Sequence, residues 1–176
     1  MNIHNKYLSY ANQVSEAVSN IVEDKLRNRI MHDYEAIPLL FFFRHCLELY
    51  FKGFNYYLNY LGCRIIIYNK GKKGHNIIIP FKEILNVIKR FGIREPNSNV
   101  KDLIEKIGTI DKDGQGWRYP ESVEGSYNHD QEEFAVSVKY DKTNKILQDI
   151  KETINWCINV EGYLDSYLKN LEDNQN

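Results

Sequence analysis

The stretch FFFRHCLELYFKG, from Phe41 to Gly53, is one of the most apolar segments of the chain, and four ionisable side chains interrupt it. They are Arg44, His45, Glu48 and Lys52. Because Arg44, Glu48 and Lys52 are four residues apart, they lie above one another on one face of a helix. Burying an unpaired charge is costly, so this stripe must be solvated, paired or directed at a ligand.

Three interpretations of the stripe are open at this point. If the stripe is a solvated face, Glu48 pairs with Arg44 and Lys52 one turn away on either side, and such pairs contribute little to stability at a surface. As part of a cleft, the same side chains line or brace a ligand site. As a structural device, Arg44 and Glu48 join Arg118 in an internal polar clamp that holds a long loop to the rest of the protein.

Length and composition favour one folded domain over residues 1–176. The chain is 43% hydrophobic and 13% aromatic, which is enough for a sizeable core. Its net charge of -1 argues against a large electrostatic footprint for duplex nucleic acid, so any nucleic-acid contact must be local.

Apolar residues at helical spacing predict an all-α bundle of four to five helices. The expected parts are an N-terminal helix within 1–35, core helices within 36–108 and a C-terminal helix over 141–170. Within the core, helices are expected over about 37–61, 80–91 and 98–108. Pro38 is placed in the first turn of its helix, Gly62 and Gly108 are predicted helix ends, and Ser98 is a predicted N-cap.

Helical periodicity disappears over residues 109–140, which indicates a long loop before the last helix. Within it, EEFAVSVKY at 132–140 alternates as a short strand does. CRIIIY at 63–68 is rich in β-branched residues and is the expected partner of that strand. The fold prediction is therefore a helical bundle with a small β excursion.

The three cysteines, Cys46, Cys63 and Cys157, have no C-x-x-C spacing, so neither a disulfide framework nor a zinc site is expected. We expect no metal and no cofactor. The first residues lack the pattern of a secretory signal, and no apolar run is long enough to cross a bilayer. These features predict a cytoplasmic protein without a membrane partner.

Two loop motifs add candidate site residues. KGHNI places His75 after a glycine turn, where an imidazole hydrogen-bonds inward or titrates. DKDGQGWRYP carries Asp111, Arg118 and Tyr119 within the long loop. An arginine between two aromatic residues can stack on a base or bind a phosphate, or it can pair with Glu48 or Asp111 as a loop clamp.

The ordered set FRHCLELYFKGFNYYL, GHNI and WRYP, followed by a long terminal helix, resembles the HEPN superfamily of nucleotide-binding helical domains. The resemblance covers roughly residues 37–170. The residues that occupy the positions of the family pattern are Glu48, Lys52, His75, Arg118, Tyr119 and Pro120. The chain departs from the pattern at Asn76, where the family usually has an acidic residue.

This resemblance implies a function in RNA biology. Many members are ribonucleases of toxin–antitoxin, abortive-infection and CRISPR systems, and they act as dimers with an arginine and a histidine in a short signature. RNRIMHDY fits that signature with Arg27, Asn28, His32 and Tyr34. Histidine supplies a proton donor or acceptor near neutral pH, and arginine stabilises charge on the phosphorane.

The position of RNRIMHDY leaves two interpretations. In the first, Arg27 and His32 are the catalytic pair of the family signature. In the second, they are cations that stabilise a helix C-terminus, because the family's catalytic string lies on the last helices whereas this one precedes the core helix. We therefore expect a homodimeric, RNA-directed effector of prokaryotic antiphage defence or a toxin–antitoxin system, with an antitoxin or another defence protein as a partner. The chemistry is either metal-independent RNA cleavage by Arg27 and His32 or nucleotide or RNA binding without catalysis.

The remaining candidates are assigned to the cleft of that effector, where they bind or brace the ligand. They are Arg44, His45, Glu48, Lys52, His75, Asp111, Arg118 and Tyr119.

Overall fold

The computed structural model of the protein describes residues 3–28, 31–63, 75–112, 114, 117 and 129–173. The described residues form helices and no strand. These elements are α1 (Ile3–Asn28), α2 (Asp33–Tyr60), α3 (Ile78–Ile88), the 3-10 helix η2 (Lys89–Phe91), α4 (Ser98–Ile110), α5 (His129–Lys139) and α6 (Lys145–Asp173). The all-α prediction is therefore confirmed for this part of the chain.

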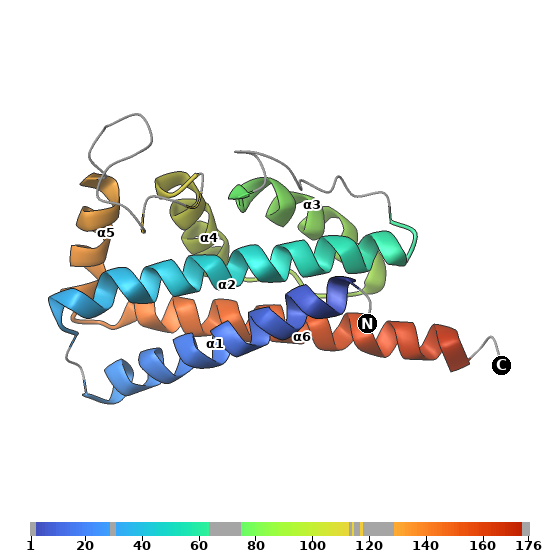
Figure 1. The fold of residues 1–176 in the computed structure, drawn as a ribbon, viewed down its shortest axis with the longest axis horizontal. Coiled ribbons are helices and arrows are strands. Elements are labelled where there is room, and N and C mark those ends of the chain that lie inside the picture. Colours follow the sequence, from blue (N-terminus) through green and yellow to red (C-terminus); the bar gives the residue numbers. More distant parts are fainter. Residues whose placement is uncertain are drawn as a thin grey trace.

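The helix α2 lies at the centre of the bundle and packs against α1, α3, α5 and α6. In Figure 1, α1 and α6 run alongside α2, and the shorter α3, α4 and α5 stand on its opposite side. The buried apolar side chains of α2 recur at steps of three and four residues, so they form one broad stripe along the helix. They are Leu39, Leu40, Phe43, Cys46, Leu47, Tyr50, Phe51, Phe54, Tyr57 and Leu58.

Two ends of the bundle can be distinguished in Figure 1. At one end, α1 finishes, α2 begins, and α5 leads into α6. At the other end, α2 finishes close to the N-terminus, and α6 runs out to the C-terminus. Among the described helices, none has the length and apolar character needed to cross a bilayer.

The start of α2 corrects the predicted position of Pro38. The helix begins at Asp33 rather than near residue 37, so Pro38 lies inside it and not in its first turn. His32 is the N-cap residue, and its backbone N–H donates a hydrogen bond to Glu35 Oε2 at 2.7 Å. The predicted end at Gly62 is consistent with its positive φ of 81°.

Both predicted boundaries of α4 were wrong, for identifiable reasons. Asn97, not Ser98, is the N-cap, because its side chain accepts from the Val100 backbone N–H at 3.0 Å. Gly108 does not end the helix, which continues to Ile110. A Cβ at Gly108 would lie only 2.5 Å from Ile78 Cγ1, so this glycine permits close packing of α3 on α4.

The predicted strand at 132–140 was also wrong, since residues 129–139 form α5. Its buried apolar residues are Phe134, Ala135 and Val138, which recur at the one- and four-residue steps of a helix face. The expected long loop is therefore shorter than 109–140, because α4 reaches residue 110 and α5 begins at 129. Residues 64–68 of the other predicted strand lie outside the described residues.

Candidate functional site

The charged stripe of α2 is buried and not solvated. Arg44 is only 1% exposed, and Glu48 is buried beside it. Arg44 Nη1 donates to Glu48 Oε2 on the next turn of the helix, and Lys52 Nζ donates to Glu48 Oε1 at 2.7 Å. The predicted pairing of Glu48 with both cations is therefore correct, but its location on a solvated face is not.

Residues distant in sequence complete this arrangement, which we call the ionic cluster (Arg44, Glu48, Lys52, His75 and Asp111). His75 Nδ1 lies 2.9 Å from Glu48 Oε1, and the His75 backbone carbonyl accepts from Arg44 Nη2. Asp111 Oδ2 lies 3.2 Å from Arg44 Nε. One guanidinium thus ties α2 to the segment that begins α3 and to the residue that follows α4.

Gly114 closes the remaining side of the guanidinium. A Cβ at this position would lie 3.0 Å from Arg44 Cζ, and the φ of Gly114 is +74°, a conformation that other residues rarely adopt. The chain after α4 therefore passes directly over Arg44. Arg118 and Tyr119, the predicted ligands in this loop, lie outside the described residues.

The electrostatics of Glu48 suit a structural role. Burial alone would raise the pKa of the Glu48 carboxyl, but the Arg44, Lys52 and His75 side chains outweigh burial and lower its pKa below the ordinary 4.5. The carboxylate is ionised at neutral pH and is held by cations from the same chain. Its three partners leave it little capacity to bind an external ligand.

His45 was predicted to belong to the same cleft as Arg44, but it follows a different face of α2. Its imidazole stacks on Phe41, with ring centroids 6.2 Å apart and planes within 5°. The structure thus brings together Arg44, Glu48, Lys52, His75 and Asp111, as predicted for one cleft, and turns His45 toward an aromatic neighbour.

Arg27 and His32 lie far from the ionic cluster. Arg27 is in the last turn of α1, and His32 caps the start of α2. Twelve residues of helix separate His32 from Arg44, which is about 18 Å along α2. The interpretation of His32 as a cation at a helix C-terminus is wrong, because it stands at a helix N-terminus.

Both members of this pair are open to solvent. The Arg27 side chain is 79% exposed, and its Nη2 lies 3.5 Å from Glu23 Oε2, which is a long ion-pair distance. His32 is exposed, and its imidazole stacks on Tyr34 with ring centroids 5.4 Å apart. Tyr34 is itself 75% exposed, so this ring is available to a further stacking partner.

Beside this pair is a depression of about 290 Å³ that we call the terminal hollow. It is lined by Lys25, Met31, Val138, Lys139, Tyr140, Asp141, Lys142, Asn144 and Leu147. The hollow lies where α1 finishes and α5 turns into α6, at the left end of Figure 1. Met31 belongs to its wall and directly precedes His32 in the chain.

Glu35 holds the hollow and His32 together. Its Oε1 accepts from Lys25 Nζ at 2.8 Å, and its Oε2 accepts from the His32 backbone N–H. The hydrogen bond from Lys25, followed by that from His32, lowers the pKa of the Glu35 carboxyl. Lys25 is therefore committed to a structural pair, and the α1–α2 connection is anchored next to the hollow.

The cations and the aromatic ring on the far wall of the hollow are more accessible. Lys139 Nζ lies 4.6 Å from the centroid of Tyr140, whose side chain is 65% exposed. Lys142 is exposed, and none of the hydrogen bonds or ion pairs among the described residues involves its side chain. The Asp141 carboxylate is used locally, since it accepts from the backbone of Thr143 and of Ile146 at the start of α6.

Sequence analysis did not identify the terminal hollow. The available signal was the KYDK run at 139–142, which combines two lysines with a tyrosine. The predicted strand at 132–140 includes only its first two residues. The packing of both α1 and α5 against α2 brings this run near Lys25 and Met31.

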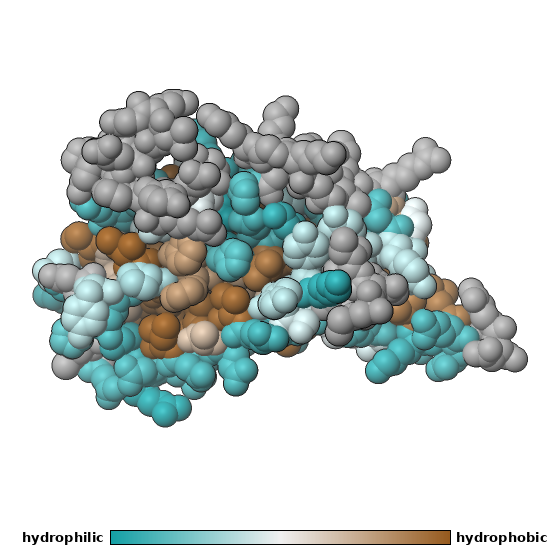
Figure 2. All heavy atoms as spheres, viewed as in Figure 1, coloured by the Kyte–Doolittle hydropathy of each residue, from teal (hydrophilic) through white to brown (hydrophobic). Residues whose placement is uncertain are grey.

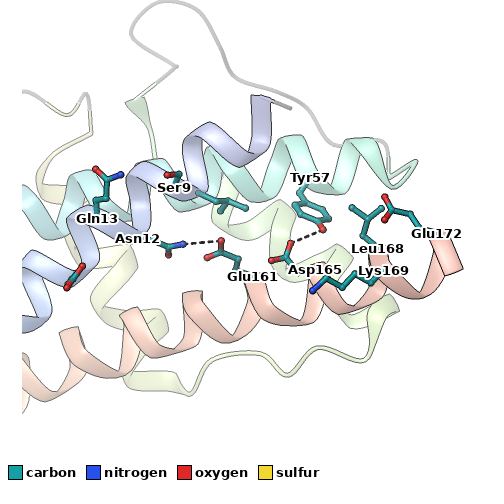
Figure 3. Close-up of a pocket in the computed structure, with 11 residues that line it drawn as sticks. Ser9, Asn12, Gln13, Tyr57, Glu161, Asp165, Leu168, Lys169 and Glu172 are labelled. Carbon is teal, nitrogen blue, oxygen red and sulfur yellow. Dashed lines mark hydrogen bonds between the residues drawn. The ribbon is translucent and has the colours of Figure 1, made fainter. Parts of the chain in front are cut away.

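A second depression, of about 620 Å³, lies between α1 and α6 (Figure 3). Here Asn12 Nδ2 donates to Glu161 Oε1 at 3.1 Å, and the Tyr57 hydroxyl donates to Asp165 Oδ1 at 3.0 Å. Burial, together with the negative charge of Asp165, raises the pKa of the Glu161 carboxyl. Over the described ranges, no three His, Cys, Asp or Glu side chains are grouped as a metal site requires.

No protein-family profile, no curated protein sequence and no solved structure matches this chain.

Proposed function

We propose that this protein is a HEPN-like, RNA-directed effector that binds single-stranded RNA at the terminal hollow. The observation that carries the proposal is the combination of two exposed tyrosines with accessible cations at one end of the bundle. The rings are Tyr34 and Tyr140, and the exposed cations are Arg27 and Lys142. Aromatic rings stack on unpaired bases, and lysine and arginine neutralise the phosphates between them.

The ionic cluster supports the HEPN-like part of the proposal. Glu48, Lys52 and His75 occupy positions of the family pattern. Lys52 Nζ and His75 Nδ1 both contact Oε1 of Glu48. A pattern spread over residues 48–75 thus corresponds to one physical unit. In this proposal the cluster fixes the fold, and the terminal hollow contacts RNA.

A homodimer is part of the same proposal. Two exposed apolar side chains, Ile37 and Phe42, lie on the N-terminal half of α2, and Figure 2 shows apolar surface in this part of the molecule. An apolar patch of this kind is typical of a surface that another protein covers. A second copy seated there would place its own His32 near the first, and light scattering of the purified protein would give the mass.

RNA binding is tested with a fluorescently labelled single-stranded RNA of twelve nucleotides, followed by anisotropy at fixed salt. Tyr140→Ala should weaken binding by about tenfold, because stacking contributes about 1–3 kcal/mol per base. Lys142→Ala should weaken binding, and the slope of the logarithm of the affinity against the logarithm of the salt concentration should decrease by about one. The matched controls are Tyr10→Ala and Lys169→Ala, which alter equally accessible residues away from the hollow. No binding by the wild type, or equal losses in variants and controls, would overturn the proposal.

Cleavage of the bound RNA is the second candidate function, and the exposure of Arg27 and His32 beside the hollow favours it. The His32 imidazole of one copy would take the proton of a 2′-hydroxyl as that oxygen bonds to phosphorus. The bond from phosphorus to the 5′-oxygen then breaks, and the His32 imidazole of the second copy protonates this oxygen. Arg27 would stabilise the negative charge of the phosphorane. The products are a 2′,3′-cyclic phosphate and a 5′-hydroxyl.

The test for cleavage is incubation of wild-type protein and His32→Ala with labelled RNA in EDTA. Cleavage by the wild type alone, with RNA binding retained by His32→Ala, is the expected result. Equal cleavage by both proteins, or cleavage by neither, would leave RNA binding without catalysis as the function.

In the cell, this function belongs to prokaryotic antiphage defence or to a toxin–antitoxin system, with an antitoxin as a partner. The basis for this context is the resemblance to the HEPN superfamily. Co-expression with the product of a neighbouring reading frame, followed by co-purification, is the corresponding test.

A further inference from the structure

A third depression, which we call the α4–α6 groove, has a volume of about 770 Å³ and no role in the function proposed above. One wall is α6, and the other is the connection from η2 to α4 together with the first residues of α4. Four side chains on the α6 wall recur at helical spacing along one face. They are Glu152, Asn155, Asn159 and Tyr163.

The α6 wall offers hydrogen-bonding and stacking groups that the protein itself does not use. Asn155 and Asn159 are exposed, and neither side chain hydrogen-bonds to a described residue. Tyr163 is 60% exposed. An asparagine amide pairs with the N6 and N7 positions of adenine, and a tyrosine ring stacks on a base. These residues extend over about 12 Å of α6, from Asn155 to Tyr163.

The opposite wall favours an anion. Arg94 is exposed, and its guanidinium forms no ion pair with the described part of the chain. The Arg94 backbone carbonyl accepts from Trp156 Nε1 at 3.1 Å, which fixes this connection against α6. The first turn of α4 contains no acidic residue, so the positive end of the helix dipole is not compensated there.

The carboxylates of the groove are already engaged by groups of the protein. Glu95 pairs with Lys89 at 2.5 Å and with Lys101 at 2.6 Å. Glu152 accepts from Asn97 Nδ2 at 2.8 Å. The charge of Glu95, which directly follows Arg94, is therefore compensated by two lysines, whereas Glu152 keeps its negative charge.

From these contacts we infer that the α4–α6 groove binds an adenine nucleotide. The phosphate lies near Arg94 and the start of α4, and the base stacks on Tyr163 with its edge toward Asn155 or Asn159. Both a free nucleotide and an adenosine within single-stranded RNA offer this chemistry. The inference concerns a site separate from the terminal hollow and does not depend on it.

Calorimetric titration with AMP and with an octamer of adenosine nucleotides tests the inference and separates the two sources. Tyr163→Ala and Asn159→Ala should each lower the affinity by about tenfold, in line with the loss of one stacked base or one paired amide. Arg94→Gln should weaken binding and reduce its salt dependence. The matched controls are Tyr10→Ala, which removes a ring of the same 60% exposure, and Arg90→Gln, which removes an exposed arginine outside the groove.

Binding of AMP identifies a free nucleotide as a sufficient ligand, whereas binding of the octamer alone identifies RNA. Absence of binding for both ligands would overturn the inference, as would wild-type affinity for them in Tyr163→Ala and Asn159→Ala. Octamer binding that is lost in Lys142→Ala and unchanged in Tyr163→Ala would overturn this inference and leave the proposed function standing. The reverse pattern would support the groove and contradict the hollow.

Discussion

Arg44 and Arg27 belong to neighbouring helices, and both stand in short strings that combine a cation with a histidine. Arg44 is 1% exposed and has the Glu48 carboxylate, the His75 carbonyl and the Asp111 carboxylate around it. Arg27 has a side chain that is 79% exposed and a single long contact to Glu23. Residues of the same type thus have opposite environments in the two regions.

The difference shows how burial separates structural charges from charges that can bind a ligand. A buried guanidinium must have partners within the chain, because an uncompensated charge would cost several kcal/mol. Once these partners enclose it, the group is not accessible to a substrate from solvent. An exposed arginine is solvated without partners and can exchange water for a phosphate.

The largest expected effect is the loss of stability in Glu48→Ala. Removing this carboxylate leaves Arg44 buried without its closest counter-ion, and we expect a decrease of about 3–5 kcal/mol in the free energy of unfolding. The matched variant Glu23→Ala removes the part-exposed carboxylate that pairs with Arg27 and Lys151, and it should change stability little. Urea unfolding of both proteins measures the difference, and similar losses would remove the distinction between the two regions.

Gly114→Ala should have the next largest effect. The new Cβ would lie 3.0 Å from Arg44 Cζ at a φ of +74°, and we expect a loss of about 1–3 kcal/mol. Gly162→Ala is the control, since a Cβ inside α6 at that position meets nothing within 4 Å and should stabilise the helix by about 0.5–1 kcal/mol. An unchanged melting temperature for Gly114→Ala would mean that the loop does not pack on Arg44.

The pH dependence of stability tests whether the ionised Glu48 carboxylate stabilises the fold. Burial raises its pKa, but the surrounding cations lower it more, so the folded-state pKa is below 4.5. The stabilisation is therefore complete above about pH 4.5 and is lost as the pH falls through the lower, folded-state value. The difference in unfolding free energy between wild type and Glu48→Gln should shrink as the pH falls below about 4.5. A difference that increases over this acidic range would contradict the lowered pKa.

The smallest effect is expected at Glu161, the carboxylate on α6 that accepts from Asn12 (Figure 3). Burial and Asp165 raise its pKa, so the stability contributed by this group decreases as the pH rises above about 4.5. Glu161→Gln should therefore raise the melting temperature at pH 7, with a gain that disappears near pH 4. Glu16→Gln, on the exposed α1 side of the same depression, should change the melting temperature neither at pH 7 nor near pH 4.

The sequence was sufficient to predict α1, α2, α3, α4 and α6 and the pairing of Glu48, because these depend on local spacing. Residues four apart on a helix are neighbours in any fold, so the contacts among Arg44, Glu48 and Lys52 follow from the numbering alone. Burial does not follow from it. The same four-residue spacing fits a surface ladder, and only the packing of residues 75, 111 and 114 over α2 encloses the guanidinium.

The wrong predictions arose where tertiary packing overrode a local signal. Gly108 has the residue type of a helix end, but the close approach of Ile77 and Ile78 gives it another use. Residues 132–140 alternate like a strand, and their burial against α2 makes them a helix. The terminal hollow was not predicted because its walls, α1 and the α5–α6 turn, are distant in sequence.

In the proposed function, exposed cations at the bundle end bind RNA and the ionic cluster maintains the fold. Lys142→Ala and Lys52→Ala are compared by anisotropy titration of single-stranded RNA, at a temperature where both variants are folded. Lys142→Ala should bind RNA more weakly than the wild type, and Lys52→Ala should bind with wild-type affinity. Weaker binding for Lys52→Ala with wild-type binding for Lys142→Ala would contradict the proposed function and move the RNA site to the ionic cluster.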